Sequence, residues 1–232
     1  MKVSIHQPSY FPWLGLLDKI NKSDTFIVLD TVQLNDNAFQ SRNIFLNHTG
    51  KVQYLVIPIE KKEYQKKMIK ELRVVDKKWQ KKHSGFMIAN YKKHPFFDEI
   101  YPYIEKIYTK KYEFLIDILL DSMFASNDIF GIKSKIVLAS ELELDNSLVK
   151  DDLLIALLKR SQATIYLSGV GAKSYQDENK FAKHNIRLSY QSFIHPNYDQ
   201  KNASTFQTGL SALDIAFNLG ADNARKLLKG KL

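Results

Sequence analysis

The chain has 232 residues, which is enough for one large domain or for one domain with a small subdomain. Hydrophobic residues make up 44% and charged residues 25%, as in soluble globular proteins, and the absence of cysteine excludes disulfides, a thiolate nucleophile and Cys-ligated zinc. The net charge of +9, carried mostly by lysines, has two explanations: a solvated lysine-rich surface, or attraction of nucleotides, nucleotide-sugars or RNA.

The chain opens with a short strand-like run in which Val3 and Ile5 are apolar. This run lacks the long apolar core of a signal peptide, and no later stretch approaches the roughly 20 apolar residues that a membrane span needs. We therefore expect a cytoplasmic protein without a membrane span.

A β-α-β unit is predicted at the start of the chain. After the first strand, Ser9 is expected to cap a helix that has Pro12 in its first turn and apolar residues at helical spacing as far as Ile20. Residues 25–29 form a compact apolar run that is typical of a buried strand. Strand, helix and strand in this order are the unit of a parallel sheet.

The rest of the chain alternates in the same way. Helices are expected at residues 79–91, 97–108, 112–124, 151–160, 174–183, 211–219 and 221–228, and strands at 53–59, 136–139, 164–167 and 186–190. The pattern predicts a single α/β domain over residues 1–232 with a mostly parallel sheet. Within it, residues 78–127 are expected to form a helical insert or cap.

The segment from His6 to Gly15 has the most unusual composition, with His, Gln, two Pro, Tyr, Phe and Trp between a strand and a helix. Ligands of open α/β sheets bind beyond the carboxyl ends of the strands, where a helix N-terminus favours phosphate or carboxylate. His6 at the end of the first strand can act as a general base, a phosphate contact or a hydrogen-bond donor. The alternative is a structural turn locked by the two prolines.

Two further polar groups follow along the chain. Asp30 ends the second strand and is soon followed by Gln33, so its carboxylate can bind a ribose hydroxyl, a metal ion or a substrate amine. A turn residue or a helix cap is the alternative. Arg42, in the polar stretch Ser41-Arg42-Asn43, can clamp a phosphate through two hydrogen bonds, or it can be an ordinary surface arginine.

A second turn of interest is Ser168-Gly169-Val170-Gly171, between a strand and a helix, with Tyr175 expected just inside that helix. Two glycines at such a turn let backbone amides approach an anion. The segment has neither the Lys-Ser/Thr ending of a Walker loop nor the dinucleotide fingerprint. A tight structural turn is therefore an equal alternative.

The last strand is followed by a polar and aromatic run that includes Tyr190, His195 and Tyr198. This run can hold a catalytic histidine, or it can be a loop restrained by Pro196. No His-x-x-x-His or Glu-x-x-His spacing occurs, so no metal site is predicted.

Together these residues resemble the WbqC-like protein family over almost the whole chain. The opening motif is long and rich in rare residues, and the later motifs follow in the family's order. The resemblance rests on His6-Gln7-Pro8, Tyr10, Pro12-Trp13, Gly15, Asp30, Val32, Gln33, Arg42-Asn43, Tyr166-Leu167-Ser168-Gly169, Gly171, Tyr175, Tyr190, Tyr198, Leu210-Ser211, Asp214 and Phe217-Asn218-Leu219-Gly220.

The family is associated with bacterial surface-glycan gene clusters, including the O-antigen loci of lipopolysaccharide biosynthesis. A role proposed for such proteins is transfer of glycine, or another acyl group, to an amino sugar. The resemblance implies functional roles for His6, Asp30, Arg42 and Tyr175.

A second resemblance concerns the fold. A strand ending in His and Pro, a helix with Gly near its start and then an apolar strand resemble the opening of nucleotidyltransferases with the His-x-Gly-His motif. Here Trp13-Leu14-Gly15-Leu16 lacks the second His, which argues against nucleotidyl transfer. The expected fold is therefore Rossmann-like or nucleotidyltransferase-like.

The leading hypothesis is an N-acyl or aminoacyl transferase that acts on the amine of a nucleotide-linked amino sugar. His6 would serve as the base, with Asp30 orienting the amine or the histidine. Phosphates would be held by Arg42 and by the turn at Gly169 and Gly171. A base or a sugar would stack on Tyr10, Trp13 and Tyr175, and the other candidate binding residues are Gln7, Gln33, Asn43, Ser168 and Tyr198.

The acyl donor is expected to be an acyl-CoA, an amino acid activated by ATP, or an aminoacyl-tRNA, which the basic charge would suit. One alternative is nucleotide-dependent activation or nucleotidyl transfer, which would release pyrophosphate from ATP or CTP. Another alternative is a non-catalytic binding or scaffold protein of a glycan-assembly complex, which would capture partners without turnover.

Overall fold

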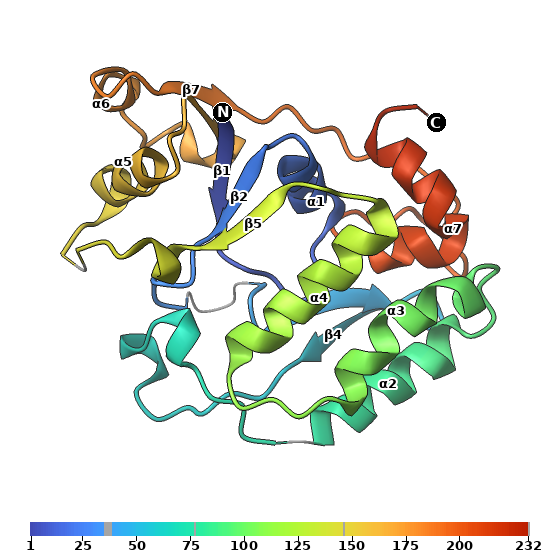
Figure 1. Cartoon of the computed structure of the whole chain (residues 1–232). Coiled ribbons are helices and arrows are strands. Elements are labelled where there is room, and N and C mark those ends of the chain that lie inside the picture. The colour runs from blue at the N-terminus through green and yellow to red at the C-terminus, as the bar shows by residue number, and fades with distance from the viewer. Residues whose placement is uncertain (35–38, 77, 146, 232) are drawn as a thin grey trace. The chain divides into compact units, whose positions relative to one another are not determined.

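The computed structural model describes residues 1–34, 39–76, 78–145 and 147–231 (Figure 1). The chain forms two compact units. The sheet unit comprises Met1–Gln7, Asp18–Thr31 and Lys133–Ile194, and the helical unit comprises Pro8–Leu17, Val32–Ile132 and His195–Leu232. The chain therefore passes between the units after residues 7, 17, 31, 132 and 194. The single domain over residues 1–232 stays a prediction.

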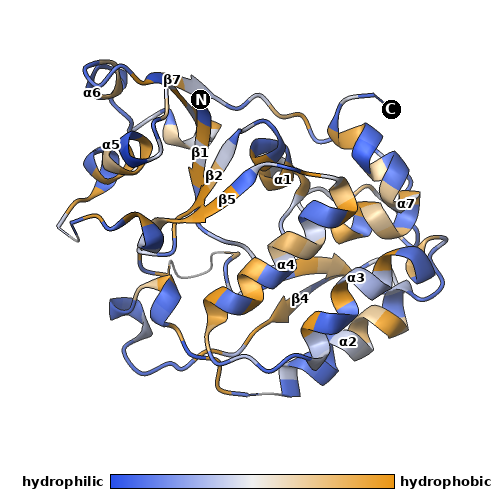
Figure 2. Cartoon of the chain, in the orientation of Figure 1, coloured by the Kyte–Doolittle hydropathy of each residue, from blue (hydrophilic) through white to orange (hydrophobic). Residues whose placement is uncertain are grey.

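The sheet unit is built on five parallel strands, which confirms the predicted α/β class with a mostly parallel sheet. The strands lie in the order β5-β2-β1-β6-β7, and every neighbouring pair is parallel. Figure 2 shows hydrophobic residues along β2 and β5. The bounds are β1 Lys2–His6, β2 Thr25–Val28, β5 Lys135–Leu138, β6 Ile165–Ser168 and β7 Arg187–Tyr190.

The strand order reverses at the centre of this sheet. From β1 the chain adds β2 and then β5 on one side, and it returns to add β6 and β7 on the other side. This is the arrangement of doubly wound sheets, in which ligands bind outside the carboxyl ends of the two strands where the order reverses. Here those strands are β1 and β6.

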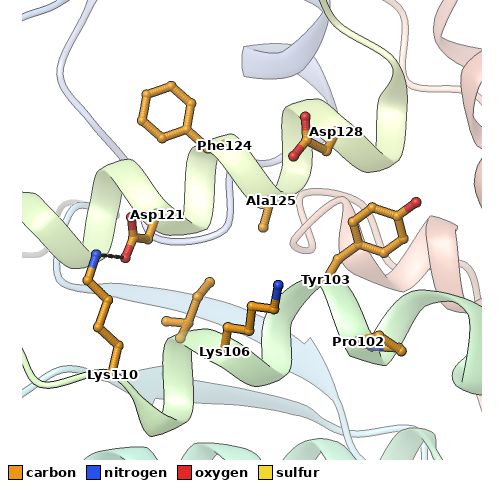
Figure 3. Close-up of a pocket in the computed structure, with 9 residues that line it drawn as sticks. Pro102, Tyr103, Lys106, Lys110, Asp121, Phe124, Ala125 and Asp128 are labelled. Carbon is orange, nitrogen blue, oxygen red and sulfur yellow. Dashed lines mark hydrogen bonds and ion pairs between the residues drawn. The ribbon is translucent and has the colours of Figure 1, made fainter.

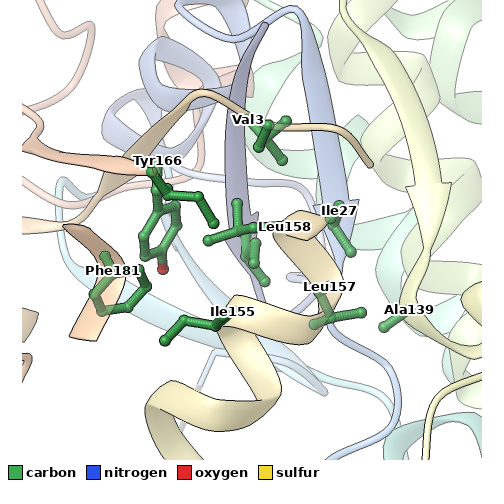
Figure 4. Close-up of a cluster of buried hydrophobic side chains, with 11 residues drawn as sticks. Val3, Ile27, Ala139, Ile155, Leu157, Leu158, Tyr166 and Phe181 are labelled. Atoms are coloured by element: carbon green, nitrogen blue, oxygen red, sulfur yellow. The ribbon is translucent and has the colours of Figure 1, made fainter. Parts of the chain in front are cut away.

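The core of the sheet unit lies between one face of the sheet and two helices, α5 Lys150–Arg160 and α6 Glu178–Ala182 (Figure 4). Side chains alternate along a strand, so Val3 and Ile5 of β1 face this core while Ser4 and His6 face the opposite side. On that opposite side, the Ser23 hydroxyl donates to Ser4 Oγ at 2.7 Å, just beyond α1 Leu14–Asn21.

In its described residues, the helical unit contains the helices α2, α3, α4 and α7 and an antiparallel strand pair, β3 and β4. In this unit α3 packs on α2, α4 and α7, and Figure 2 shows a hydrophobic stretch along α4. None of the helices in the described residues is long and apolar enough to cross a membrane. The bounds are β3 Arg42–Leu46, β4 Val52–Val56, α2 Lys78–Tyr91, α3 Phe97–Thr109, α4 Leu115–Phe130 and α7 Leu213–Leu228.

Two local predictions are wrong, each because a side chain has another hydrogen-bond partner. Ser9 caps no helix: its hydroxyl donates to the Phe39 carbonyl at 2.9 Å, and α1 begins only at Leu14. Tyr175 precedes its helix, because Asp177 accepts from the Asn179 amide and caps α6 there. The polar stretch around Arg42, for which no element was predicted, is a strand that pairs with β4.

Two helix ends illustrate the role of glycine with a positive φ. α4 runs to Phe130, beyond the predicted end at residue 124, and stops where Gly131 has a φ of 66°. The predicted break at Gly220 is confirmed, since this residue interrupts α7 with a φ of 77° and a ψ of 166°.

Candidate functional site

The carboxyl ends of β1 and β6 bring together four of the predicted site residues. Ser4 of β1 pairs with Leu167 of β6, so two residues further on His6 reaches the level of Gly169. Gln7 follows His6, and Ser168 ends β6. The sequence prediction placed these residues at strand ends but did not show that the two strands are neighbours.

The His6 imidazole is held in one tautomer and in its neutral form. Its Nδ1–H donates to the Gln7 carbonyl at 2.8 Å, which leaves the basic lone pair on Nε2. Burial and the positive charge of Lys19 lower the pKa of His6 to about 4. At neutral pH the ring can therefore accept a proton or a hydrogen bond through Nε2.

The turn after β6 leaves open space over its two glycines. A Cβ on Gly169 or Gly171 would meet no atom within 4 Å, and neither residue has a positive φ. The fold itself therefore does not require glycine at either position. Beside them Tyr175 is 73% exposed, and the Ser168 hydroxyl donates to the Gln176 side chain at 2.9 Å. The backbone here is accessible to a ligand.

Asp30 lies at the same edge of the sheet but is occupied by another contact. Its fully buried carboxylate accepts from the Ser140 amide at 3.0 Å and from the Ser140 hydroxyl at 2.6 Å. These bonds join the end of β2 to the turn after β5, which favours an anchoring role over the predicted orienting role. Among the described residues, no three His, Asp or Glu side chains gather as metal ligands would.

In the helical unit, Tyr10 and Asn43 are buried. The Tyr10 hydroxyl shares a hydrogen bond of 3.0 Å with His83 Nδ1, and its ring meets the edge of Trp79. The Asn43 amide donates to the carbonyls of Tyr10 and Phe11 at 2.9 and 2.6 Å. It thereby holds a loop in which Phe11 has a φ of 43°. This packing favours structural roles over stacking on a ligand.

The remaining candidates of the helical unit lie on separate elements. The Arg42 guanidinium lies 4.8 Å from the centre of the Tyr54 ring. Trp13 forms an isolated antiparallel β-bridge with Ser211, and the exposed Gln33 forms another with Met68. Their predicted contacts with a ligand stay predictions.

The helical unit also contains a buried polar network around Asp214, a family-motif position, which includes the candidate binding residue Tyr198. Asp214 accepts hydrogen bonds from the hydroxyls of Tyr91 at 3.0 Å and Tyr198 at 2.7 Å, and from the Asn218 amide at 3.2 Å. Burial raises the pKa of Asp214 to about 6, although these donors oppose the shift. No sequence signal connected Tyr91 to this carboxylate.

An open groove of about 580 Å³ lies between α3 and α4 of the helical unit (Figure 3). Tyr103 and Phe124 expose their rings at its rim, while Lys106 lies along it and Lys110 pairs with Asp121 at 2.7 Å. No residue of the predicted site lines this groove.

Comparison with known proteins gives consistent results. A protein of Mycobacterium tuberculosis named "Uncharacterized protein Rv1507c" is 30% identical over 224 residues, covering 95% of each chain. No solved structure matches. The match to the WbqC-like protein family spans residues 7–226, which includes every predicted site residue except His6. This chain therefore belongs to the WbqC-like protein family.

Proposed function

We propose that the protein is an N-acyl or aminoacyl transferase that binds a nucleotide-linked amino sugar at the carboxyl ends of β1 and β6. The observation that carries the proposal is that β1, which ends at His6, lies beside β6, which leads into the open turn at Gly169 and Gly171, where the strand order reverses. Unobstructed glycines suit close approach of a pyrophosphate, and the exposed Tyr175 ring suits stacking on a base or a sugar.

In the proposed reaction, the sugar amine attacks the carbonyl carbon of the acyl donor. A nitrogen–carbon bond forms, and the bond to the donor's leaving group breaks with its electron pair. One proton of the amine moves to Nε2 of His6, which is neutral because of burial and Lys19. Bound phosphates would favour the imidazolium, and so would raise the pKa of His6 from about 4 toward neutral pH during turnover.

The test is a search for acylated product by mass spectrometry. The purified protein is mixed with UDP- and dTDP-linked amino sugars and with each donor class: acyl-CoA, aminoacyl-tRNA, and amino acid plus ATP. We expect the mass of one acyl group to be added to the sugar nucleotide with one donor class. We expect His6→Ala to abolish this product while the protein stays folded.

Gly171→Ala separates binding from folding. Its Cβ would enter open space, so we expect the melting temperature to stay unchanged and the KM for the sugar nucleotide to rise. The matched control is Gly85→Ala in α2, where a Cβ also meets nothing within 4 Å and where KM is expected to stay the same.

The outcomes distinguish the alternatives. Absence of acylated product with every donor rejects the transferase. Pyrophosphate release from ATP or CTP without an acyl donor identifies nucleotidyl transfer instead. Unchanged activity in His6→Ala removes His6 from the role of base.

A further inference from the structure

Lys19 of α1 is a buried cation that has no acidic partner among the residues that the structure describes. The residue is 4% exposed, and its ammonium donates to the Ile5 carbonyl at 2.8 Å. Within the described ranges of the chain, Lys19 forms no ion pair with any carboxylate. Removing a charge from water is costly, and buried ammonium groups are normally compensated by an anion. A neutral carbonyl does not supply that compensation.

The acid next to Lys19 in the sequence is committed elsewhere. Asp18 is 3% exposed, and its Oδ2 accepts from Lys22 Nζ at 2.9 Å and from the Gln191 side-chain amide at 2.7 Å. The backbone N–H of Gln191 in turn donates to the Ser168 carbonyl at 2.8 Å. Asp18 thus ties α1 to the end of β6 and does not neutralise Lys19.

The direction of α1 places the Lys19 ammonium near the carboxyl edge of the sheet. Since β1 and β2 are parallel, the helix between them runs from the carboxyl edge back to the amino edge, where the Asp24 amide donates to the Lys2 carbonyl. Helical side chains lean toward the helix N-terminus. The ammonium accordingly contacts the backbone of Ile5, the residue before His6.

The side chains of Lys19 and His6 differ in their charge at neutral pH. Burial lowers the pKa of Lys19 to about 8, so the ammonium is still the main form at pH 7, whereas His6 is neutral. The positive charge of Lys19, which no described carboxylate pairs with, therefore lies beside the carboxyl end of β1, the end that the glycine turn after β6 also flanks.

We propose that Lys19 is an anion-binding residue of the sheet unit, whose ammonium takes a phosphate group of the ligand held where β1 and β6 end. For the class of ligand, this inference rests on the sugar nucleotide of the proposed function, but it does not require acyl transfer. The negative charge of the phosphate would compensate the positive charge of the Lys19 ammonium, which contacts the neutral Ile5 carbonyl.

The experiment is isothermal titration calorimetry of the full chain with inorganic pyrophosphate, UDP and dTDP. Lys19→Met removes the charge and keeps most of the volume, and Lys19→Gln provides a second variant that retains polarity. Because an unpaired buried charge is removed, both variants are expected to fold, with a melting temperature equal to or above that of the wild type. The matched control is Lys22→Met, an exposed lysine of the turn after the same helix.

We expect both Lys19 variants to bind pyrophosphate and the diphosphates roughly 10- to 100-fold more weakly than the wild type. Lys22→Met is expected to change affinity by less than about threefold. Equal affinity in the wild type and a folded Lys19 variant overturns the proposal, as does a wild type that binds none of the three probes.

The two proposals can fail separately. Pyrophosphate binding that depends on Lys19, without any acylated product, supports the anion site and rejects the transferase. Acylated product formed by Lys19→Met with an unchanged KM for the sugar nucleotide rejects the anion site and keeps the transferase.

Discussion

The buried carboxyl of Asp214 should make the helical unit lose stability as pH rises. Its folded pKa of about 6 lies above the ordinary value of 3.8, so the folded state binds the proton more tightly than the unfolded state. The resulting stabilisation is complete below pH 3.8 and is lost as pH rises through 6. The full difference corresponds to about 3 kcal/mol, of which roughly 1.5 kcal/mol falls between pH 8 and pH 5.

Asp214→Asn removes the titration and keeps the shape. The amide loses one acceptor, but that cost is the same at every pH and cancels when two pH values are compared. We therefore expect the stability of the wild type relative to the variant to increase by roughly 1.5 kcal/mol from pH 8 to pH 5. The control is Asp222→Asn on the same helix, whose side chain is 89% exposed and lies outside the buried network around Asp214.

Urea unfolding followed by tryptophan fluorescence measures the free energy of unfolding of the helical unit, which contains Asp214. The chain has two tryptophans, Trp13 and Trp79, and both belong to the helical unit. The m-values of the proteins are compared at each pH to verify that the same surface unfolds. A difference between wild type and Asp214→Asn that stays constant from pH 8 to pH 5 would refute the assignment of a raised pKa to Asp214.

Three further predictions concern one charge and two glycines. In an NMR titration, the chemical shifts of the His6 imidazole should change with a midpoint near pH 4. Lys19→Met should raise that midpoint, because the positive charge of Lys19 is one cause of the low pKa of His6. A wild-type midpoint near the ordinary pKa of 6.5 contradicts this prediction. Gly220→Ala should cost roughly 1–3 kcal/mol, since φ 77° and ψ 166° suit only glycine and the new Cβ would lie 2.7 Å from the Phe96 ring. Gly85→Ala in α2 should instead add about 0.5–1 kcal/mol, and equal melting temperatures for these two variants would contradict both estimates.

Local patterns were sufficient for the strands of the sheet unit but not for their order. β2 could be predicted because three of its four residues are apolar, and all four, including Thr25, are buried. The pairing of β1 with β6 joins segments from opposite halves of the chain, and no local pattern encodes it. The hydrogen bond of the Ser9 hydroxyl could not be predicted for the same reason, because its acceptor, the Phe39 carbonyl, is thirty positions away. β3 was not predicted because it begins with the polar residues Arg42 and Asn43, which give this strand no apolar pattern at its start.

The candidate site shows the same division between chemistry and placement. His6 and the two glycines were predicted from residue type and from their position at strand ends. Lys19 was not, because a lysine between Asp18 and Ile20 has the pattern of an ordinary helix surface, and only the packing reveals its burial. Asp30 was singled out correctly as a strand-end carboxylate, but its hydrogen bonds to Ser140 depend on a distant turn.

The repeated passage of the chain between the two units has a consequence for synthesis on the ribosome. The sheet unit begins with the first residue, yet β5, β6 and β7 emerge only after the whole segment Val32–Ile132 of the helical unit. A nascent chain ending at Ile132 holds β1 and β2 but not the strand that flanks His6 on its other side. The helical unit in turn is incomplete until α7, its last helix, has been synthesised. A single cut in the coding sequence therefore cannot yield either unit as a separate gene product.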